Sequence, residues 1–407
     1  RAHHADVGGI SPGSMPAPFD ADGRPRSLSI DDEGIRLAPQ PITAAVRQRF
    51  AAASRTPTQR FGDLRAQEAA NRVGHRLLRE LLQREDPTAL KARNDALIEY
   101  AERRMRAALA QLPAGRYEGE DWLDDDGVSA APVRLHAVVE IGAGQAVVDL
   151  RGCDDAGPGP LNAVRAVAES VVLYVFRCLA GALSEDDGDL PANAGIMRPL
   201  TILTRPGSVV DARYPSAVSA GNVETSQRLV DTLFRALAIA SPQTVPAASC
   251  GSMNNVLMGG QSPTPWVHYE TLAGGAGASA AGQGADAIHT HMTNTLNTPI
   301  EVLEHTFPLR IRRYAIAART DSRDRGEFSG SSEVSESRES NDQAARGGRG
   351  VLREYTFLAA AEVTILTERR VLPPWSIGCE DAGDLGKNTV DRRDGATESL
   401  RGKCRLR

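Results

Sequence analysis

The sequence has few aromatic residues and no long apolar run. Phe, Trp and Tyr make up 4% of the 407 residues, although hydrophobic residues in total reach 41%. The core is therefore expected to consist of aliphatic side chains and of close backbone contacts at glycine. No apolar stretch approaches the roughly 18 residues that a membrane-spanning helix needs, and the start shows no signal-peptide pattern. These absences predict a globular protein without a membrane partner.

Paired cysteines and clustered positive charge are also lacking. The five cysteines are scattered and never spaced as CxxC, which excludes a zinc ribbon and argues against a disulfide framework. A reducing compartment fits best, so we expect a cytoplasmic location. The 47 Lys and Arg residues are outnumbered by 52 Asp and Glu residues, a net charge of −5. No basic stripe with interleaved aromatics is present, so no nucleic-acid partner is expected.

Periodicity favours an α+β fold. Apolar residues recur at three and four positions through 43–112, with a break at Asp86-Pro87, which predicts an antiparallel helical hairpin. Strict alternation in 133–141 and 146–150 predicts a β-hairpin, and further strands are expected near 266–272, 307–316, 351–357 and 363–366. Without regular βαβ alternation, the prediction is a helical hairpin packed on a mixed, mainly antiparallel sheet.

These patterns divide the chain into five segments. Segment 319–350 has almost no aliphatic residues and many Ser, Arg and Glu, which predicts a mobile surface insertion. The expected order is an extended segment with a histidine loop (1–42), the helical hairpin (43–112), an α+β core (113–318), the polar insertion (319–350) and a C-terminal β region (351–407).

The first candidate site lies in the opening residues RAHHADVGG. His3, His4 and Asp6 have the imidazole and carboxylate groups that bind zinc or manganese. They form an incomplete ligand set at a start without Met, which indicates that further ligands lie upstream or on a partner. The alternative is that the histidine pair before two glycines is turn chemistry alone.

The second candidate site combines a glycine run at 274–284 with the string HTHMTNT at 289–295. Residues without Cβ let backbone N–H groups approach a substrate or a subunit, and two histidines two positions apart share one face of a strand. A flexible surface loop is the alternative reading, and a metal-ligand role for the two histidines is disfavoured because isolated HxH pairs are ambiguous. The residues assigned to substrate or subunit contact are Gly274, Gly275, Gly277, His289, His291 and Asn294.

Other catalytic and nucleotide-binding strings are incomplete. Gly9 to Gly13 matches GxSxG, but Pro12 has no N–H to donate to an oxyanion. Gly275 to Ala280 fits a relaxed dinucleotide fingerprint without the following helix or acidic residue. No Walker A string is present. The chain is therefore not expected to bind ATP alone.

Ordered strings along nearly the whole chain resemble one family. They are the HH start with GGISPGSM (8–15), RTPTQRFGDLRAQEAAN (55–71), VVDLRG (147–152), GPLNA (159–163), RPL (198–200), GNVET (221–225), YETLAGGAGA (269–278), HTHMTNT (289–295) and LPPW (372–375). In these strings the chain resembles the hydantoinase B and 5-oxoprolinase family. The resemblance implies a subunit that opens cyclic amides such as hydantoins or 5-oxoproline, with ATP handled by a second subunit.

The resemblance and the histidine loop together predict the metal-binding catalytic subunit of an ATP-dependent cyclic-amide hydrolase. His3 is the first choice of ligand for a divalent metal, His4 the second, and Asp6 is an orienting residue or base. ATP is expected mainly on a hydantoinase A-like partner. The family's upstream HxxD ligands are lacking, which allows for loss of activity. The alternatives are an ATP-dependent carboxylase of the acetone or acetophenone type and a non-catalytic remnant or assembly subunit.

Overall fold

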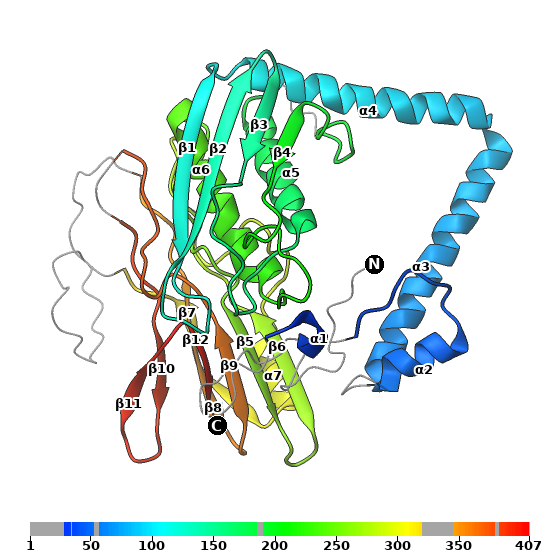
Figure 1. The fold of residues 1–407 in the computed structure, drawn as a ribbon. Helices are drawn as coiled ribbons and strands as arrows, with labels where there is room; N and C mark the ends of the chain where they lie inside the picture. Colours follow the sequence, from blue (N-terminus) through cyan, green and yellow to red (C-terminus); the bar gives the residue numbers. More distant parts are fainter. Residues whose placement is uncertain are drawn as a thin grey trace.

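The computed structural model describes residues 28–33, 35–52, 57–184, 190–319, 345–378 and 382–406. The predicted α+β class is confirmed, with sheets that are mainly antiparallel (Figure 1). The helices are α1 (Ile30–Glu33), α2 (Ala44–Ala52), α3 (Pro57–Arg84), α4 (Pro87–Ala110), α5 (Arg165–Ala182), α6 (Ser226–Ala240) and α7 (Ile300–Thr306), with a π-helical turn η1 (Gly221–Thr225) directly before α6. None of these described helices is long and apolar enough to cross a membrane.

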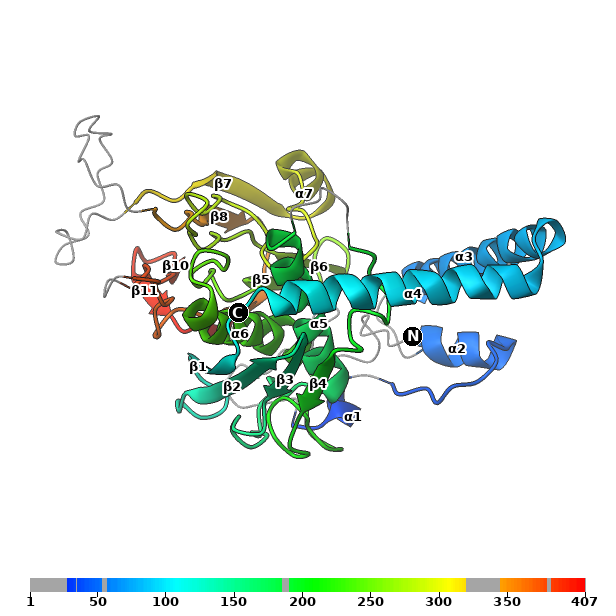
Figure 2. The same ribbon diagram turned by 90° about the horizontal axis from the view of Figure 1, so that it is seen from above.

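The first sheet has the strand order β1-β2-β3-β4. Its strands are β1 (Gly115–Leu123), β2 (Val133–Gly142), β3 (Gln145–Asp149) and β4 (Leu200–Leu203). The predicted β-hairpin is confirmed as β2 and β3, and β4 adds a parallel edge. Helices α5 and α6 cover one face of this sheet (Figure 2). A Cβ on Gly119 would lie 2.6 Å from the backbone of α6, so only glycine lets β1 cross the helix this closely.

The second sheet has the order β12-β9-β5-β6 and is wholly antiparallel. The remaining strands are β5 (Asn255–Gly260), β6 (Trp266–Thr271), β7 (Leu309–Ile316), β8 (Val351–Phe357), β9 (Glu362–Leu366), β10 (Asn388–Asp391), β11 (Thr397–Leu400) and β12 (Lys403–Leu406). The strands expected near 266, 307, 351 and 363 are therefore confirmed as β6 to β9. Strands β7 and β8 form one further hairpin and β10 and β11 another.

The predicted helical hairpin is wrong, although both of its helices exist. Asp86 accepts a hydrogen bond from the N–H of Ala89 (2.8 Å) and so caps α4. From that corner α3 and α4 diverge instead of packing along their length (Figure 1). Only the C-terminal part of α4, with buried Ala101, Met105 and Leu109, reaches the core. Leucines of the apolar face of α3 are exposed instead, namely Leu77, Leu78, Leu81 and Leu82.

Two of the predicted segments lie partly outside the described residues. Of the polar insertion, residues 320–344 are outside, whereas 345–350 run beside the glycine run as ordered backbone. Of the extended N-terminal segment, residues 1–27 and 34 are outside, and with them the histidine loop.

Candidate functional site

The site is built around the start of α6, where the string GNVET forms the π-helical turn η1. π-helical turns are rare and frequently mark functional positions. Gly221 opens the turn against the backbone of Asn162, and a Cβ there would lie 2.1 Å from the Asn162 carbonyl oxygen. From Val223 to Phe234 every residue is buried, including the charged Glu224, Arg228 and Asp231. Buried charges at a helix start require compensating partners.

Those partners form a buried ionic network, here named the α6 network. It comprises Asp121 of β1, Asp124 just after it, Glu224 of η1, Arg228 and Asp231 of α6, Glu368 and Arg369 after β9, and Lys403 of β12. The network joins both sheets to α6, because its members come from β1, β12 and the segment that follows β9. Elements far apart in the sequence thus meet at one polar centre.

Two arginines form the middle of the α6 network. Arg369 donates through Nη2 to Asp121 Oδ2 (2.6 Å) and to Asp231 Oδ2 (3.2 Å). Arg228 donates through Nη2 to Glu368 Oε2 at 3.3 Å. Lys403 donates to the other oxygen of Glu368. Each cation thus has a carboxylate partner, which is the condition under which charges are tolerated in a protein interior.

Gly251 closes the network from the loop before β5. Its φ of +57° lies in the left-handed region. A Cβ at this position would lie 2.9 Å from Arg369 Nε, 3.2 Å from Arg228 Nε and 3.2 Å from Asp231 Oδ2. Both backbone conformation and space therefore require glycine here.

Glu224 is the network's candidate neutral acid. Its side chain is fully buried, and one carboxyl oxygen accepts a hydrogen bond from Asn255 Nδ2 at 2.5 Å. Burial, and after it the nearby charge of Glu368, raises the pKa of Glu224 to about 8. The other oxygen has no hydrogen-bond partner among the described residues. At neutral pH the group therefore holds a proton that it can donate.

His291 connects the α6 network to the protein surface. Its Nε2 lies 3.2 Å from Asp231 Oδ1, and its Nδ1 lies 3.3 Å from the hydroxyl of Tyr174. Burial raises the pKa of Asp231, but the hydrogen bond and charge of His291 and the charge of Arg369 outweigh it and hold this pKa below its ordinary value. Tyr174 is half-buried, and burial raises its pKa, so its hydroxyl keeps its proton. The three groups form a relay that can move a proton between the surface and a buried carboxylate.

The backbone around this relay is unusual. Five non-glycine residues among those described have a positive φ, and four of them, Asn254, Ala287, His291 and Arg369, belong to segments that bound the relay or the α6 network. Such conformations cost free energy and cluster at functional sites. The strain therefore supports assigning function to this region.

His289 faces a different acid from His291. Burial raises the pKa of Glu270, but the imidazole of His268 at 3.7 Å, the hydrogen bond from the N–H of Thr298 (2.5 Å) and the charge of Arg353 outweigh burial and hold this pKa below its ordinary value. Burial lowers the pKa of His289, against the opposing charge of Glu270. The Nε2 atom of His289 is buried without a hydrogen-bond partner among the described residues. A neutral imidazole with a free nitrogen can accept a proton or bind a ligand.

The glycine run is packed rather than open. Gly274 exchanges two backbone hydrogen bonds with Ile288 (3.0 and 2.9 Å). A Cβ on Gly275 would lie 1.9 Å from the carbonyl oxygen of Gly348, and one on Gly277 would lie 1.8 Å from that of Ala247. The lack of side chains thus serves close backbone packing beside His289 and His291, while Asn294 is exposed. The contact role of these residues stays a prediction.

The predicted metal ligands His3, His4 and Asp6 lie outside the described residues. Within the part of the chain that the structure describes, no group of three or more His, Cys, Asp or Glu side chains could hold a metal ion. The geometry therefore provides no metal site of its own in the described ranges.

Sequence patterns did not reveal most of the α6 network. Arg228 and Asp231 are three positions apart on α6, a spacing that charged residues also have on the solvated face of an amphipathic helix. One signal was available, because GNVET and the following SQRLVD place three charged residues within eight positions of an otherwise apolar helix. The partner positions in β1 and β12 have no recognisable spacing from α6.

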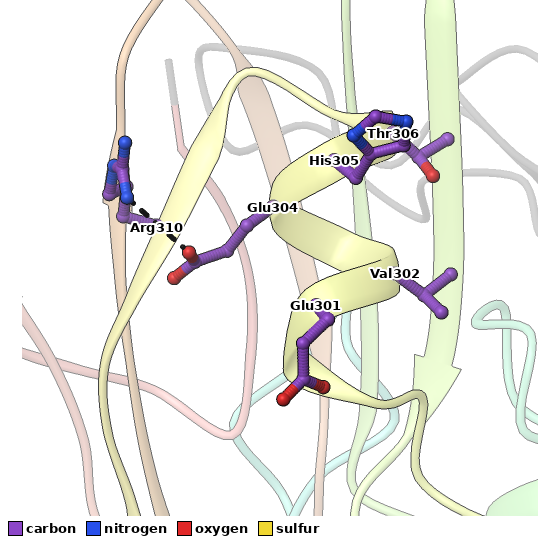
Figure 3. Close-up of a pocket in the computed structure, with 6 residues that line it drawn as sticks. All are labelled: Glu301, Val302, Glu304, His305, Thr306 and Arg310. Atoms are coloured by element: carbon purple, nitrogen blue, oxygen red, sulfur yellow. Dashed lines mark hydrogen bonds and ion pairs between the residues drawn. The ribbon is translucent and has the colours of Figure 1, made fainter.

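One hollow of the surface is separate from the α6 network. It lies over α7 and is lined by Glu301, Val302, Glu304, His305, Thr306 and Arg310 (Figure 3). Glu304 accepts hydrogen bonds from the backbone N–H of Ile311 (2.9 Å) and from Arg310 (3.5 Å). The carboxylate thus fixes the turn into β7, and no relay group lines the hollow.

Comparison with known proteins gives a consistent result. The sequence model of the hydantoinase B/oxoprolinase family matches residues 1–407. An uncharacterized protein of Methanocaldococcus jannaschii is 33% identical over 413 residues, covering 100% of this chain and 66% of the relative. The 5-oxoprolinase of Dictyostelium discoideum is 31% identical over 97% of this chain and 29% of its own length. A protein of a Pseudomonas species that is named as a putative subunit of a D-/L-hydantoinase is 28% identical. The match covers 98% of this chain and 64% of the relative.

Two solved structures share the fold. The ATP-dependent caprolactamase of Pseudomonas jessenii superposes with a TM-score of 0.75 at 24% identity, covering 98% of this chain and 67% of that one. Acetone carboxylase superposes with a TM-score of 0.70 at 15% identity, and the match covers 90% of this chain and 48% of that one. At these identities the likeness concerns the fold alone. The chain spans less than two thirds of the length of the three curated relatives.

Proposed function

The chain belongs to the hydantoinase B/oxoprolinase family, and from this membership we propose that it is the catalytic subunit of an ATP-dependent cyclic-amide hydrolase. The substrate class is a small lactam of the hydantoin or 5-oxoproline type. The observation that carries the proposal is the relay of Tyr174, His291 and Asp231. His291 lies in the family string HTHMTNT, and the three groups have the geometry of a proton-transfer system. His291 also has a φ of +51°, a strained backbone conformation of the kind that clusters at functional sites.

In this proposal the chain's own residues manage the proton of ring opening. When an amide C–N bond breaks, the leaving nitrogen must take up a proton. Tyr174 is half-buried and holds its proton at neutral pH, so its hydroxyl is the candidate donor to that nitrogen. His291 takes up the proton that the attacking water gives up, and the buried Asp231 stabilises the resulting imidazolium. The imidazolium then returns this proton to the Tyr174 phenolate and becomes neutral again. Glu224 holds a second, deeper proton beside Asn255.

The metal and ATP parts of the proposal rest on the family and on residues outside the described ranges. His3, then His4, would hold a divalent zinc or manganese ion, with Asp6 as orienting residue or base. Such an ion supplies Lewis-acid polarisation of a carbonyl oxygen. ATP is assigned mainly to a hydantoinase A-like partner, because the chain has no Walker A string and a relative is named as one subunit of a hydantoinase.

The test is an activity assay of the chain together with a hydantoinase A-like subunit. Hydantoin, 5-oxoproline and acetone would each be supplied with and without ATP, and ring opening or carboxylation followed by product analysis. Ring opening that needs both ATP and the partner supports the proposal. Turnover of a cyclic amide without ATP, or carboxylation of acetone instead, would contradict it, and the latter would favour the carboxylase alternative.

A further inference from the structure

Gln227 lies on the first turn of α6, is fully buried and contacts the segment that carries His291. Its Nε2 donates to the carbonyl oxygen of Thr290 (3.0 Å) and to Oγ1 of Thr293 (2.6 Å). Its Oε1 accepts from the backbone N–H of Met292 at 3.2 Å. One side-chain amide, with both of its N–H donors used, therefore binds the chain on either side of His291.

The turn that carries His291 needs support from outside its own backbone. Residues 289–293 belong to no helix or strand, and His291 has a φ of +51°. This left-handed conformation costs free energy in any residue with a Cβ. The backbone of the turn contributes the hydrogen bond from the N–H of Thr293 to the carbonyl oxygen of Thr290 (3.1 Å). The amide of Gln227 adds three more hydrogen bonds from α6.

Gln227 and Asp231 hold His291 from two successive turns of α6. They are four positions apart and so lie on one face of the helix. Gln227 binds the backbone around His291, and Asp231 binds its ring, with 3.2 Å between the Oδ1 of Asp231 and the imidazole Nε2. Asp231 is itself fixed by the N–H of Ser249 (3.1 Å) and by Arg369 (3.2 Å). A shift of the turn relative to α6 would therefore move the ring away from a carboxylate that cannot follow it.

The contact with Asp231 also fixes which ring nitrogen of His291 carries the proton. The pKa of Asp231 lies below its ordinary value, so its carboxylate accepts hydrogen bonds and donates none. In the neutral imidazole the facing Nε2 is therefore protonated, and the lone pair of Nδ1 accepts from the hydroxyl of Tyr174 at 3.3 Å. Rotation of the ring by half a turn would put carbon atoms against both partners. The relay thus requires one tautomer in one orientation.

We propose that Gln227 is a positioning residue of the relay, because its amide clamps the turn at 290–293 and so holds the imidazole of His291 between Asp231 and Tyr174. Gln227 acts through His291 and not on the substrate. The catalytic part of this inference rests on the proposed function, whereas the orientation of the ring does not. The two parts can therefore be tested separately.

NMR of the chain with isotope-labelled histidine tests the orientation without partner, ATP or substrate. The ring signals of His291 are assigned by their loss in the variant His291→Gln. In the wild type, Nε2 should carry a proton that exchanges slowly with water, because it is hydrogen-bonded to the buried Asp231. Gln227→Met keeps the length of the side chain but removes all three hydrogen bonds of the clamp. It should accelerate this exchange at least about 10-fold by letting the turn open locally.

The kinetic counterpart is the ATP-dependent ring-opening rate, measured with the nucleotide-binding partner. A misplaced imidazole should lower the kcat of Gln227→Met by about 10- to 100-fold. KM should change little, since Gln227 is not proposed to touch the substrate.

Asn162→Leu is the matched control. It removes another buried side-chain amide, whose Nδ2 donates instead to the carbonyl oxygens of Gly157, Gly159 and Ala217 at 2.8–2.9 Å. This control should lower the unfolding midpoint about as much as Gln227→Met does. It should leave the exchange of the His291 proton at the wild-type rate.

Thr293→Val provides a milder variant, because it removes one of the three hydrogen bonds and keeps the shape of the side chain. It should accelerate exchange less than Gln227→Met, and it decides the question if Gln227→Met does not fold.

Three results would overturn the proposal. The first is a wild type whose His291 Nε2 has no protected proton. The second is exchange at the wild-type rate in whichever of Gln227→Met and Thr293→Val folds, and the third is equal acceleration in Asn162→Leu. Faster exchange with an unchanged kcat would instead uphold the clamp and contradict the catalytic role of the relay.

Discussion

The imidazole Nε2 of His291 lies 3.2 Å from the carboxylate of Asp231, although the two residues are 60 positions apart in the sequence. This contact joins the segment HTHMTNT to the α6 network. It also gives the second histidine of the HTH string a defined partner on each ring nitrogen, since Tyr174 lies on the other side. Changes to the network should therefore alter stability, and changes to the relay should alter catalysis.

Asp231→Asn should strongly destabilise the protein. The carboxylate neutralises Arg369 and accepts from His291 and from the N–H of Ser249, all within the interior. Removing one partner of a buried ion pair costs roughly 3–5 kcal/mol. Urea unfolding measures the loss. Asp95→Asn, which breaks an exposed pair with Lys91, is the control and should barely shift the midpoint; equal effects of the two variants would refute the role of the network.

Glu224→Gln should flatten the pH dependence of stability. The raised pKa of about 8, against 4.5 for the free group, means that the folded protein binds this proton more tightly than the unfolded chain. The free energy of unfolding therefore falls as pH rises from about 4.5 through about 8, by up to roughly 1.4 kcal/mol per unit. The amide has no such proton to lose.

Unfolding of wild type and Glu224→Gln between about pH 5 and pH 9 gives this comparison, with the exposed Glu80→Gln as control. The free energy of unfolding of the Glu224 variant, relative to that of wild type, should increase as pH rises. Parallel curves would show that Glu224 is ionised throughout.

Gly251→Ala should lower the free energy of unfolding more than an alanine substitution at another glycine of positive φ. Gly251 combines a φ of +57° with a close approach to Arg369, Arg228 and Asp231, whereas Gly207 has a φ of +94° and nothing within 4 Å of the place that a Cβ would occupy. Gly207→Ala should cost about 1 kcal/mol through backbone strain. Gly251→Ala should cost about 1–3 kcal/mol more through overpacking. Similar losses in denaturant unfolding would contradict the packing argument.

The sequence predicted the elements of this fold better than their assembly. Alternation located β2 and β3, since a half-buried strand shows a period of two on its own. Helical periodicity located α3 and α4 but could not show that α3 stays uncovered, because an apolar face looks the same whether its partner is a neighbouring helix or another molecule.

The candidate site was predictable only where it forms a local string. His289 and His291 stood out beside the glycine run, whereas Arg369 and Asp121 are 248 positions apart and meet only after both sheets have formed. The glycines were expected to let the backbone approach a substrate or a subunit, and the sequence could not show that the backbone near Ala247 and Gly348 lies against them. Long-range pairing leaves no spacing for a pattern to detect.

The most direct test of the relay is the ATP-dependent ring-opening rate of Tyr174→Phe, measured with the chain and its nucleotide-binding partner. The substitution removes only the hydroxyl that lies 3.3 Å from His291 Nδ1 and keeps the ring. Loss of a positioned general acid should lower kcat by about 10²–10⁴, with little change in KM or in the unfolding midpoint. A variant that opens the ring at the wild-type rate would contradict the assignment of the proton to Tyr174.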